Sequence, residues 1–156
     1  MMVLLPSGLT VDLSAQPVKM RQKPDPAKFE LAVSLIKKFE GLHGRDNFPY
    51  YGFGHRLLPG ENLSYDMTEA EAEALLRRDL MKRYALFRSY GKDALLLMVL
   101  SYNVGTSALL GYGKRPKSRL LRKLEAGDRD IYREYISYCH YRGGGGKVGP
   151  AGRQRH

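Results

Sequence analysis

The chain has 156 residues and a formal net charge of +10, from 26 basic and 16 acidic side chains. This length supports one hydrophobic core, and without internal repeats it predicts a single domain, expected to be a monomer. The only cysteine, Cys139, excludes an intramolecular disulfide. The longest apolar run, residues 94–100, is far shorter than the ~20 residues that span a membrane. We therefore expect no stable membrane insertion.

The positive charge indicates a polyanionic partner. Nucleic acid is the generic candidate, but the sequence contains no zinc finger, RNP motif or basic zipper, so nucleic acid is not the expected partner. Runs of charged residues most often form a solvent-exposed face of the protein and bind no partner. The charge therefore supports an anionic partner without selecting one.

Residues 1–24 are expected to form an irregular leader, followed by one folded domain over residues 25–156. The N-terminal segment Met1–Gly8 has no basic region, and Pro6 interrupts its apolar stretch. We therefore predict no signal peptide.

A helix is predicted over residues 26–40. Asp25 is the expected N-cap, Pro26 suits the first turn, and Gly41 is a stop signal. The apolar positions at helical spacing are Ala32, Leu35, Ile36 and Phe39.

Glu40 is the last residue of this predicted helix. A carboxylate there faces the negative end of the helix dipole, and apolar walls would further favour its protonated form. Such a group is suited to act as a general acid. The alternative is that Glu40 is a solvated residue at the end of a surface helix.

The elements expected further along are a hairpin or loop region over 43–66, with strands near 48–58, a helix over 69–89, a buried helix over 93–104, a loop over 111–117, helices over 118–126 and 129–140, and a glycine loop over 143–146. Thr68 and Glu71 form a capping box for the second helix. The pattern predicts an α+β, predominantly helical fold, in which a small hairpin lobe and a helical lobe flank a cleft.

Several motifs follow one another in a recognisable order: the sequence FEG at residues 39–41, GFGH at 52–55, the capped helix at 67–80, SYNVG at 101–105, the SRLLRKLEAGD segment at 118–128 and a glycine- and arginine-rich segment at 146–155. Together they resemble the phage-type lysozymes, glycoside hydrolases with the pattern Glu-Gly, then Asp, then Thr-x-Gly-x-Gly-His. The resemblance extends from about Leu35 to the end of the chain.

The resemblance implies an enzyme that cleaves peptidoglycan between N-acetylmuramic acid and N-acetylglucosamine, with Glu40 as the catalytic acid. Peptidoglycan would be the partner, and no metal or other cofactor is implied. Such a protein would be made in the cytoplasm of a bacterial or phage-infected cell and would act at the cell wall, whose acidic polymers fit the positive charge.

One departure from the family pattern concerns the hairpin. The family separates its glutamate and histidine by twenty positions, whereas Glu40 and His55 are fifteen apart. Tyr50 then occupies the threonine position, and Asp46 is the only acid in the interval. Asp46 is either the second catalytic carboxylate or a turn residue, and the Tyr50 hydroxyl could orient water.

Other candidates also have two interpretations. The resemblance pairs His55 with Asp79 structurally, and the alternative for His55 is a proton shuttle. Asn103 is either a sugar ligand or a core-edge amide, and Ser118 is either a substrate contact or a helix N-cap.

Tyr51 and Tyr102 are expected in the cleft. Because the chain has no tryptophan, sugar stacking would fall to tyrosines or Phe53.

Three functions therefore remain open: a hydrolytic lysozyme, a lytic transglycosylase that uses Glu40 alone, and a catalytically silent module that binds the wall. The missing aspartate and threonine favour the second. Each function predicts different products from purified wall.

Overall fold

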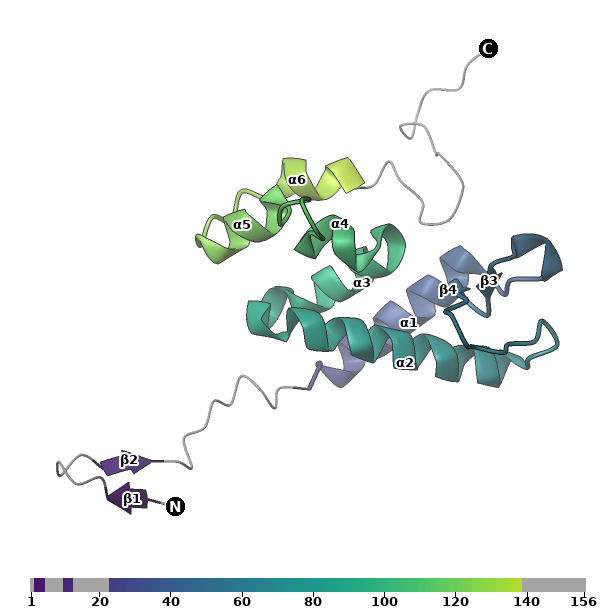
Figure 1. Cartoon of the computed structure of the whole chain (residues 1–156), viewed down its shortest axis with the longest axis horizontal. Coiled ribbons are helices and arrows are strands. Elements are labelled where there is room, and N and C mark those ends of the chain that lie inside the picture. The colour runs from purple at the N-terminus through teal and green to yellow at the C-terminus, as the bar shows by residue number, and fades with distance from the viewer. Residues whose placement is uncertain (1, 5–9, 13–22, 139–156) are drawn as a thin grey trace, which may run out of the picture.

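Figure 1 shows the computed structural model, which describes residues 2–4, 10–12 and 23–138. The helices are α1 (Pro26–Glu40), η3 (Arg45–Asn47), α2 (Glu69–Phe87), η4 (Arg88–Asp93), α3 (Ala94–Val104), α4 (Thr106–Leu110), α5 (Arg119–Glu125) and α6 (Tyr132–Ser137). The strands form two antiparallel pairs, β1 (Met2–Leu4) with β2 (Thr10–Asp12) and β3 (Tyr50–Tyr51) with β4 (His55–Arg56). The predicted α+β, predominantly helical class is confirmed.

Helix α1 begins and ends at the predicted residues. The Asp25 carboxylate accepts a hydrogen bond from the amide of Lys28 at 2.9 Å, which satisfies a free donor of the first turn. At the other end, Gly41 has a φ of 66°, a conformation that glycine adopts more readily than other residues. Glu40 is therefore the last helical residue, held where the chain turns toward the hairpin.

The predicted apolar face of α1 is wrong at two positions. Leu35 and Phe39 are exposed, and the buried stripe comprises Phe29, Ala32, Val33 and Ile36. These four follow helical spacing and face the core. Because these four residues face the core, Phe39 at the end of α1 points away from it. Phe39 lines the cleft described below.

Helix α2 starts with the predicted capping box. The Thr68 hydroxyl accepts from the amide of Glu71 at 3.2 Å, and the amide of Thr68 donates to the Glu71 carboxylate at 2.7 Å. The helix ends at Phe87, two residues before the predicted end, and the chain continues as η4. Gly91 breaks the helical path there with a φ of 59° and a ψ of −120°. This turn directs the chain back into α3.

Helix α3 is the centre of the core. Leu97 and Met98 are fully buried, and the helix packs against α1, α2 and α4. The Ser101 hydroxyl, also buried, donates to the carbonyl of Met98 at 2.8 Å, so its burial leaves no unpaired donor. Within the part of the chain that the structure describes, no helix has the length and apolar character needed to cross a membrane.

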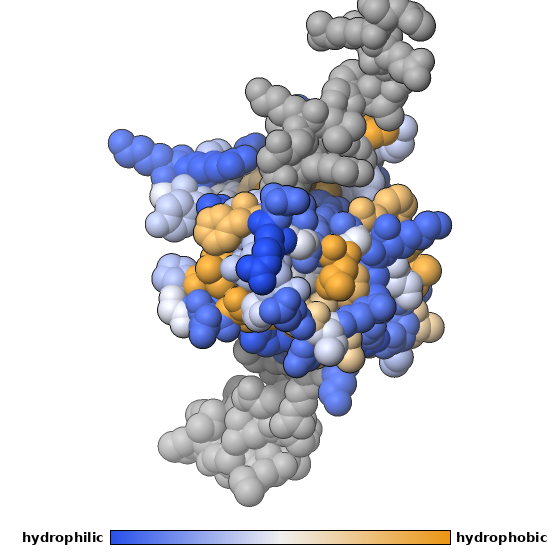
Figure 2. Space-filling view, turned by 90° about the vertical axis from the view of Figure 1, so that its right-hand side faces the viewer, coloured by the Kyte–Doolittle hydropathy of each residue, from blue (hydrophilic) through white to orange (hydrophobic). Residues whose placement is uncertain are grey.

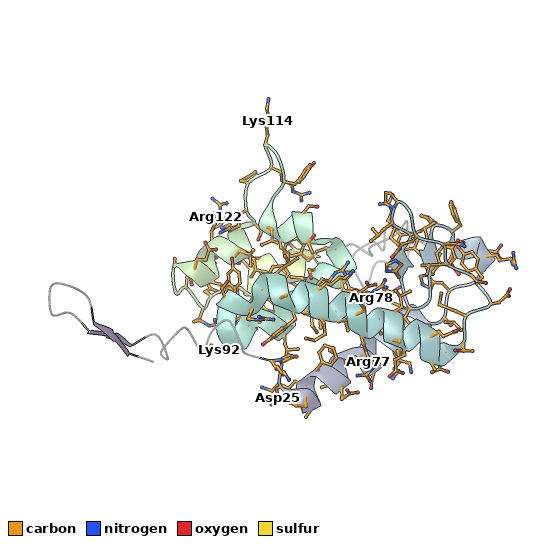
Figure 3. All side chains as sticks on the ribbon, turned by 60° about the horizontal axis from the view of Figure 1, so that its bottom comes forward. Asp25, Arg77, Arg78, Lys92, Lys114 and Arg122 are labelled. Atoms are coloured by element: carbon orange, nitrogen blue, oxygen red, sulfur yellow. The ribbon has the colours of Figure 1, made fainter. Side chains whose placement is uncertain are left out.

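Ion pairs join α1 to α2 along their exposed sides. Lys37 lies 2.6 Å from a Glu73 oxygen and 2.9 Å from a Glu69 oxygen. Arg77, labelled on α2 in Figure 3, binds both carboxylate oxygens of Glu30 at 2.6 and 2.7 Å. Single exposed pairs stabilise little, but a bidentate pair within a network constrains how two helices align. The network therefore helps to set the position of Glu40.

Several elements differ from the expectation. The strands β1 and β2 lie within the leader that was predicted to be irregular, and α4 was not predicted at all. The last predicted helix, residues 129–140, corresponds to the shorter α6. Cys139, the glycine loop over 143–146 and the motif over 146–155 lie outside the described residues.

Candidate active site

A cleft of about 1060 Å³ lies between the hairpin region and the helical body. Its walls come from the end of α1, the segment 43–58, one side of α2 and the junction of α3 with α4. Figure 2 views the end of the molecule that carries β3 and β4 and shows apolar patches interspersed with polar ones. Three exposed apolar side chains, those of Phe39, Phe48 and Leu58, belong to the cleft lining.

The Glu40 carboxylate lies directly against the β3–β4 turn. A Cβ placed on Gly54 would be 3.4 Å from Glu40 Oε2 and 3.4 Å from the Tyr102 hydroxyl oxygen. Gly54 has a φ of 98°, which side chains disfavour. A glycine at this position therefore lets the hairpin approach both groups closely. The Glu40 side chain keeps 28% exposure toward the cleft.

Tyr102 forms the cleft wall behind Glu40. Its hydroxyl donates to the carbonyl of Phe53 at 2.6 Å, which ties α3 to the hairpin. The Arg83 guanidinium lies 4.9 Å from the centre of its ring, a cation–π arrangement. Burial raises the pKa of the Tyr102 hydroxyl, and the carboxylates of Asp79 and Glu40 act in the same direction. Tyr102 therefore stays neutral and serves as a hydrogen-bond donor.

His43 is a member of the site that sequence reasoning missed. Its Nε2 lies 3.5 Å from Glu40 Oε2, and its side chain is only 14% exposed. The ring meets Tyr50 edge-on, with 6.2 Å between centroids. The sequence did hold a signal for this contact: His43 follows Glu40 by three residues, and a residue three positions beyond the end of a helix can fold back to contact its last residue.

The other predicted cleft residues occupy different positions in the lining. Asp46 is exposed within η3, and Tyr50 and Asn103 are half-buried. All three line the same cleft as Glu40. Among the described residues, the side chains of Asp46 and Asn103 have no hydrogen-bond partner, so both can bind a ligand.

Three predicted contacts lie elsewhere. Tyr51 is buried and stacks on Tyr65 at 4.1 Å, outside the cleft lining. The Ser118 hydroxyl accepts from the amide of Leu121 at 3.2 Å, so it caps α5. Phe53 belongs to the buried core, so its ring is not available to stack on a sugar. Phe39 and Phe48 are the phenylalanines exposed in the cleft lining.

His55 is held between two carboxylates. Its Nδ1 lies 2.5 Å from Asp79 Oδ2, and its Nε2 lies 2.7 Å from Glu61 Oε2. Glu61, which the sequence analysis did not single out, also accepts from the amide of Leu58 at 3.0 Å and from Arg78 at 3.3 Å. Arg78 is labelled beside Arg77 on α2 in Figure 3. With both nitrogens occupied, His55 has no free atom for proton transfer.

The two carboxylates favour the charged form of His55. The hydrogen bond with Asp79 raises the pKa of His55 above 6.5, the bond with Glu61 adds to this, and burial opposes it. In return, His55 holds the pKa of Glu61 below its usual value. The imidazolium and its partners thus link β4, the following loop and α2.

Three basic side chains, those of Arg56, Lys82 and Arg83, also line the cleft. They can pair with anionic groups of a ligand. Lys114 lies apart from this set, on the loop between α4 and α5 that projects from the body in Figure 3. In the described part of the chain, no group of three or more His, Cys, Asp or Glu side chains is arranged to hold a metal ion.

Glycoside hydrolases commonly use a pair of carboxyl groups that flank a cleft, and Glu40 and Asp46 both line this cleft. Comparison with known protein families matches residues 37–155 to phage lysozymes. The chain therefore belongs to the phage lysozyme family, which supports a peptidoglycan-cleaving, lysozyme-type function with peptidoglycan as the substrate. No curated protein and no solved structure matches the chain significantly.

Replacing Asp79 by asparagine should lower stability in a pH-dependent manner. Because the folded pKa of His55 is raised, the pair stabilises the fold fully below the unfolded value near 6.5, and this contribution disappears as the pH rises through the folded pKa. We expect a loss of about 1.5–3 kcal/mol at pH 5–6 that shrinks at higher pH. Denaturant unfolding at several pH values measures it. An equal loss at every pH would contradict charge pairing.

Gly54→Ala should lower activity, because the new methyl group would be in van der Waals contact with Glu40 Oε2 and the Tyr102 hydroxyl and would restrict their movement. Gly60→Ala is the matched control: Gly60 also has a positive φ, 83°, but a Cβ there meets nothing within 4 Å. Both changes should destabilise by roughly 1–3 kcal/mol through backbone strain. Lysis of purified wall and thermal unfolding separate the two effects. Equal activity of the two variants would show that the contact at Gly54 is unimportant.

Proposed function

We propose that the protein is an N-acetylmuramidase that hydrolyses the bond between N-acetylmuramic acid and N-acetylglucosamine in the bacterial cell wall. The observation that carries this proposal is the position of Glu40. Its carboxylate lies at the junction of hairpin and helical body, partly exposed to a cleft that can hold a polymer. The proposed site of action is the cell wall.

Glu40 is proposed as the general acid. Its protonated carboxyl group donates the proton to the glycosidic oxygen as the bond from that oxygen to the sugar C1 breaks, and a carboxylate remains. The helix end and the surrounding side chains shield the group on one side and leave the cleft side open. Gly54 leaves room beside it for the sugar.

Asp46 is proposed as the second carboxylate. Three acidic side chains line the cleft, those of Glu40, Asp46 and Asp79. Asp79 is engaged by His55, which leaves Asp46 to activate a water on the opposite face of the ring, as an inverting hydrolase requires. The Tyr50 hydroxyl, in the same lining, would orient this water.

The substrate contacts are proposed from exposed members of the lining. Phe39 and Phe48 offer apolar ring faces on which sugars can stack. The amide of Asn103 is available to the N-acetyl or hydroxyl groups of the glycan. Arg56 and Lys82 suit the carboxylates of the lactyl groups and peptides of the wall.

A lytic transglycosylase is the second candidate. It needs only one acid, because a hydroxyl group of the substrate attacks C1 in place of water. The specific observation in its favour is the small hairpin. Strands β3 and β4 contain two residues each, Tyr50 stands at the family's threonine position, and Asp46 lies on an exposed turn.

Glu40→Gln should abolish wall lysis and leave the fold intact, since the amide keeps the shape but has no transferable proton. The expected loss is on the order of 10²- to 10⁴-fold. Turbidity loss of purified wall measures activity, and circular dichroism checks the fold. Asp66→Asn, which changes a carboxylate that is 84% exposed and lies outside the cleft lining, is the control and should retain activity. A Glu40→Gln rate within a few-fold of the unaltered protein would exclude Glu40 as the acid.

Mass analysis of the released muropeptides should show reducing ends, and Asp46→Asn should reduce their release by at least about 100-fold. Products with 1,6-anhydro ends, together with full activity of Asp46→Asn, would establish the transglycosylase instead. A protein that binds wall but releases nothing would be a binding module. Tyr50→Phe, assayed in parallel with Asp46→Asn, measures how much the Tyr50 hydroxyl contributes to the rate of muropeptide release.

A further inference from the structure

His43 lies half-buried beside the proposed acid. Its Nε2 lies 3.5 Å from Glu40 Oε2, while its Nδ1 is buried and has no hydrogen-bond partner among the described residues. The backbone amide of His43 donates to the carbonyl of Gly52 at 2.8 Å, which attaches this loop to the β3–β4 turn. The edge of Tyr50 limits the rotation of the ring.

These contacts favour one tautomer of the neutral ring. A buried N–H group without a partner is rare in proteins, whereas an unpaired acceptor is tolerated more often. The proton therefore belongs on Nε2, where it faces Glu40, and the lone pair belongs on the unpartnered Nδ1. The distance of 3.5 Å is long for a hydrogen bond, but catalytic contacts commonly shorten when substrate binds.

We propose that His43 is a positioning residue for Glu40. This inference rests on the proposed function, in which Glu40 is the general acid. The Nε2–H group of His43 binds Oε2 of the protonated carboxyl group, so the transferable proton is held on Oε1. That proton passes to the glycosidic oxygen as its bond to C1 breaks, and the electron pair left on Glu40 is shared by both carboxylate oxygens.

His43 then assists the reaction through the change in charge. Its hydrogen bond to a neutral carboxyl group is weak, and it strengthens as Glu40 becomes a carboxylate. An interaction that is stronger in the transition state than in the ground state raises kcat and leaves KM nearly unchanged. The loss of one charge-assisted hydrogen bond corresponds to about a 10- to 100-fold decrease in rate.

His43 belongs to the short segment that follows the proposed acid. Glu40 and the β3–β4 turn are joined by a short segment that runs through η3, and His43 lies at its start. The ring consequently fills the space between the end of α1 and Tyr50.

Two amide variants test the proposal, because the side-chain nitrogen of glutamine can replace Nε2 and that of asparagine can replace only Nδ1. We expect His43→Gln to keep kcat within about 3-fold. His43→Asn and His43→Leu should lose about 10- to 100-fold in kcat, with KM nearly unchanged. Rates of muropeptide release at several wall concentrations give both constants, and thermal unfolding checks each fold.

Equal kcat values for the glutamine and asparagine variants would overturn the proposal, and so would full activity of His43→Leu. If His43→Leu fails to fold, the two amide variants still decide. Nitrogen-15 NMR of the histidine ring should show the proton on Nε2, with a shift that changes in Glu40→Gln. A proton on Nδ1 instead would also overturn it. If the unaltered protein releases no product, both the proposed function and the role of His43 are contradicted. If the unaltered protein is active and all His43 variants keep its kcat, only the role of His43 is contradicted.

Discussion

The site depends on the close approach of the hairpin to the end of α1 at Gly54. The Glu40 carboxylate and the Tyr102 hydroxyl lie so near the backbone of Gly54 that even a Cβ there would be in van der Waals contact with both. Tyr102 strengthens the contact through its hydrogen bond to Phe53, and Lys37, which pairs with acids on α2, lies 5.3 Å from the centre of the Phe53 ring. Helix, hairpin and core are therefore connected at one point, and the acid lies there.

Charged groups have two separate roles around the cleft. His55, Asp79 and Glu61 satisfy one another, so they stabilise the hairpin but have no free atoms for chemistry. Glu40, His43 and Asp46 line the cleft and are not part of this set of paired charges. This division follows from burial, because a buried charge must be paired whereas a charge at the cleft edge can remain available.

The shortened hairpin changes which residues can reach Glu40. In the family pattern, an aspartate and a threonine lie in this span. Here Asp46 lies on an exposed turn, Tyr50 stands in place of the threonine, and His43 Nε2 lies 3.5 Å from the Glu40 carboxylate. We attribute this to the short connection, which leaves η3 and two-residue strands where a longer hairpin would fit.

The sequence by itself determined where the main helices begin, and it singled out Glu40 as the proposed acid. Asp25, Thr68 and Gly41 act on their own turns through short-range hydrogen bonds and backbone preferences, so α1 and α2 begin as predicted. The same local signals could not foresee α4 or the outward position of Phe39, because both depend on packing between helices distant in sequence. Tertiary structure alone decided that His43 and Tyr102 converge on Glu40, that Tyr51 and Ser118 lie elsewhere, and that Glu61 completes the pair around His55. Each of these contacts is set by how the hairpin settles against α1, α2 and α3, and this is fixed by the shape of the whole core.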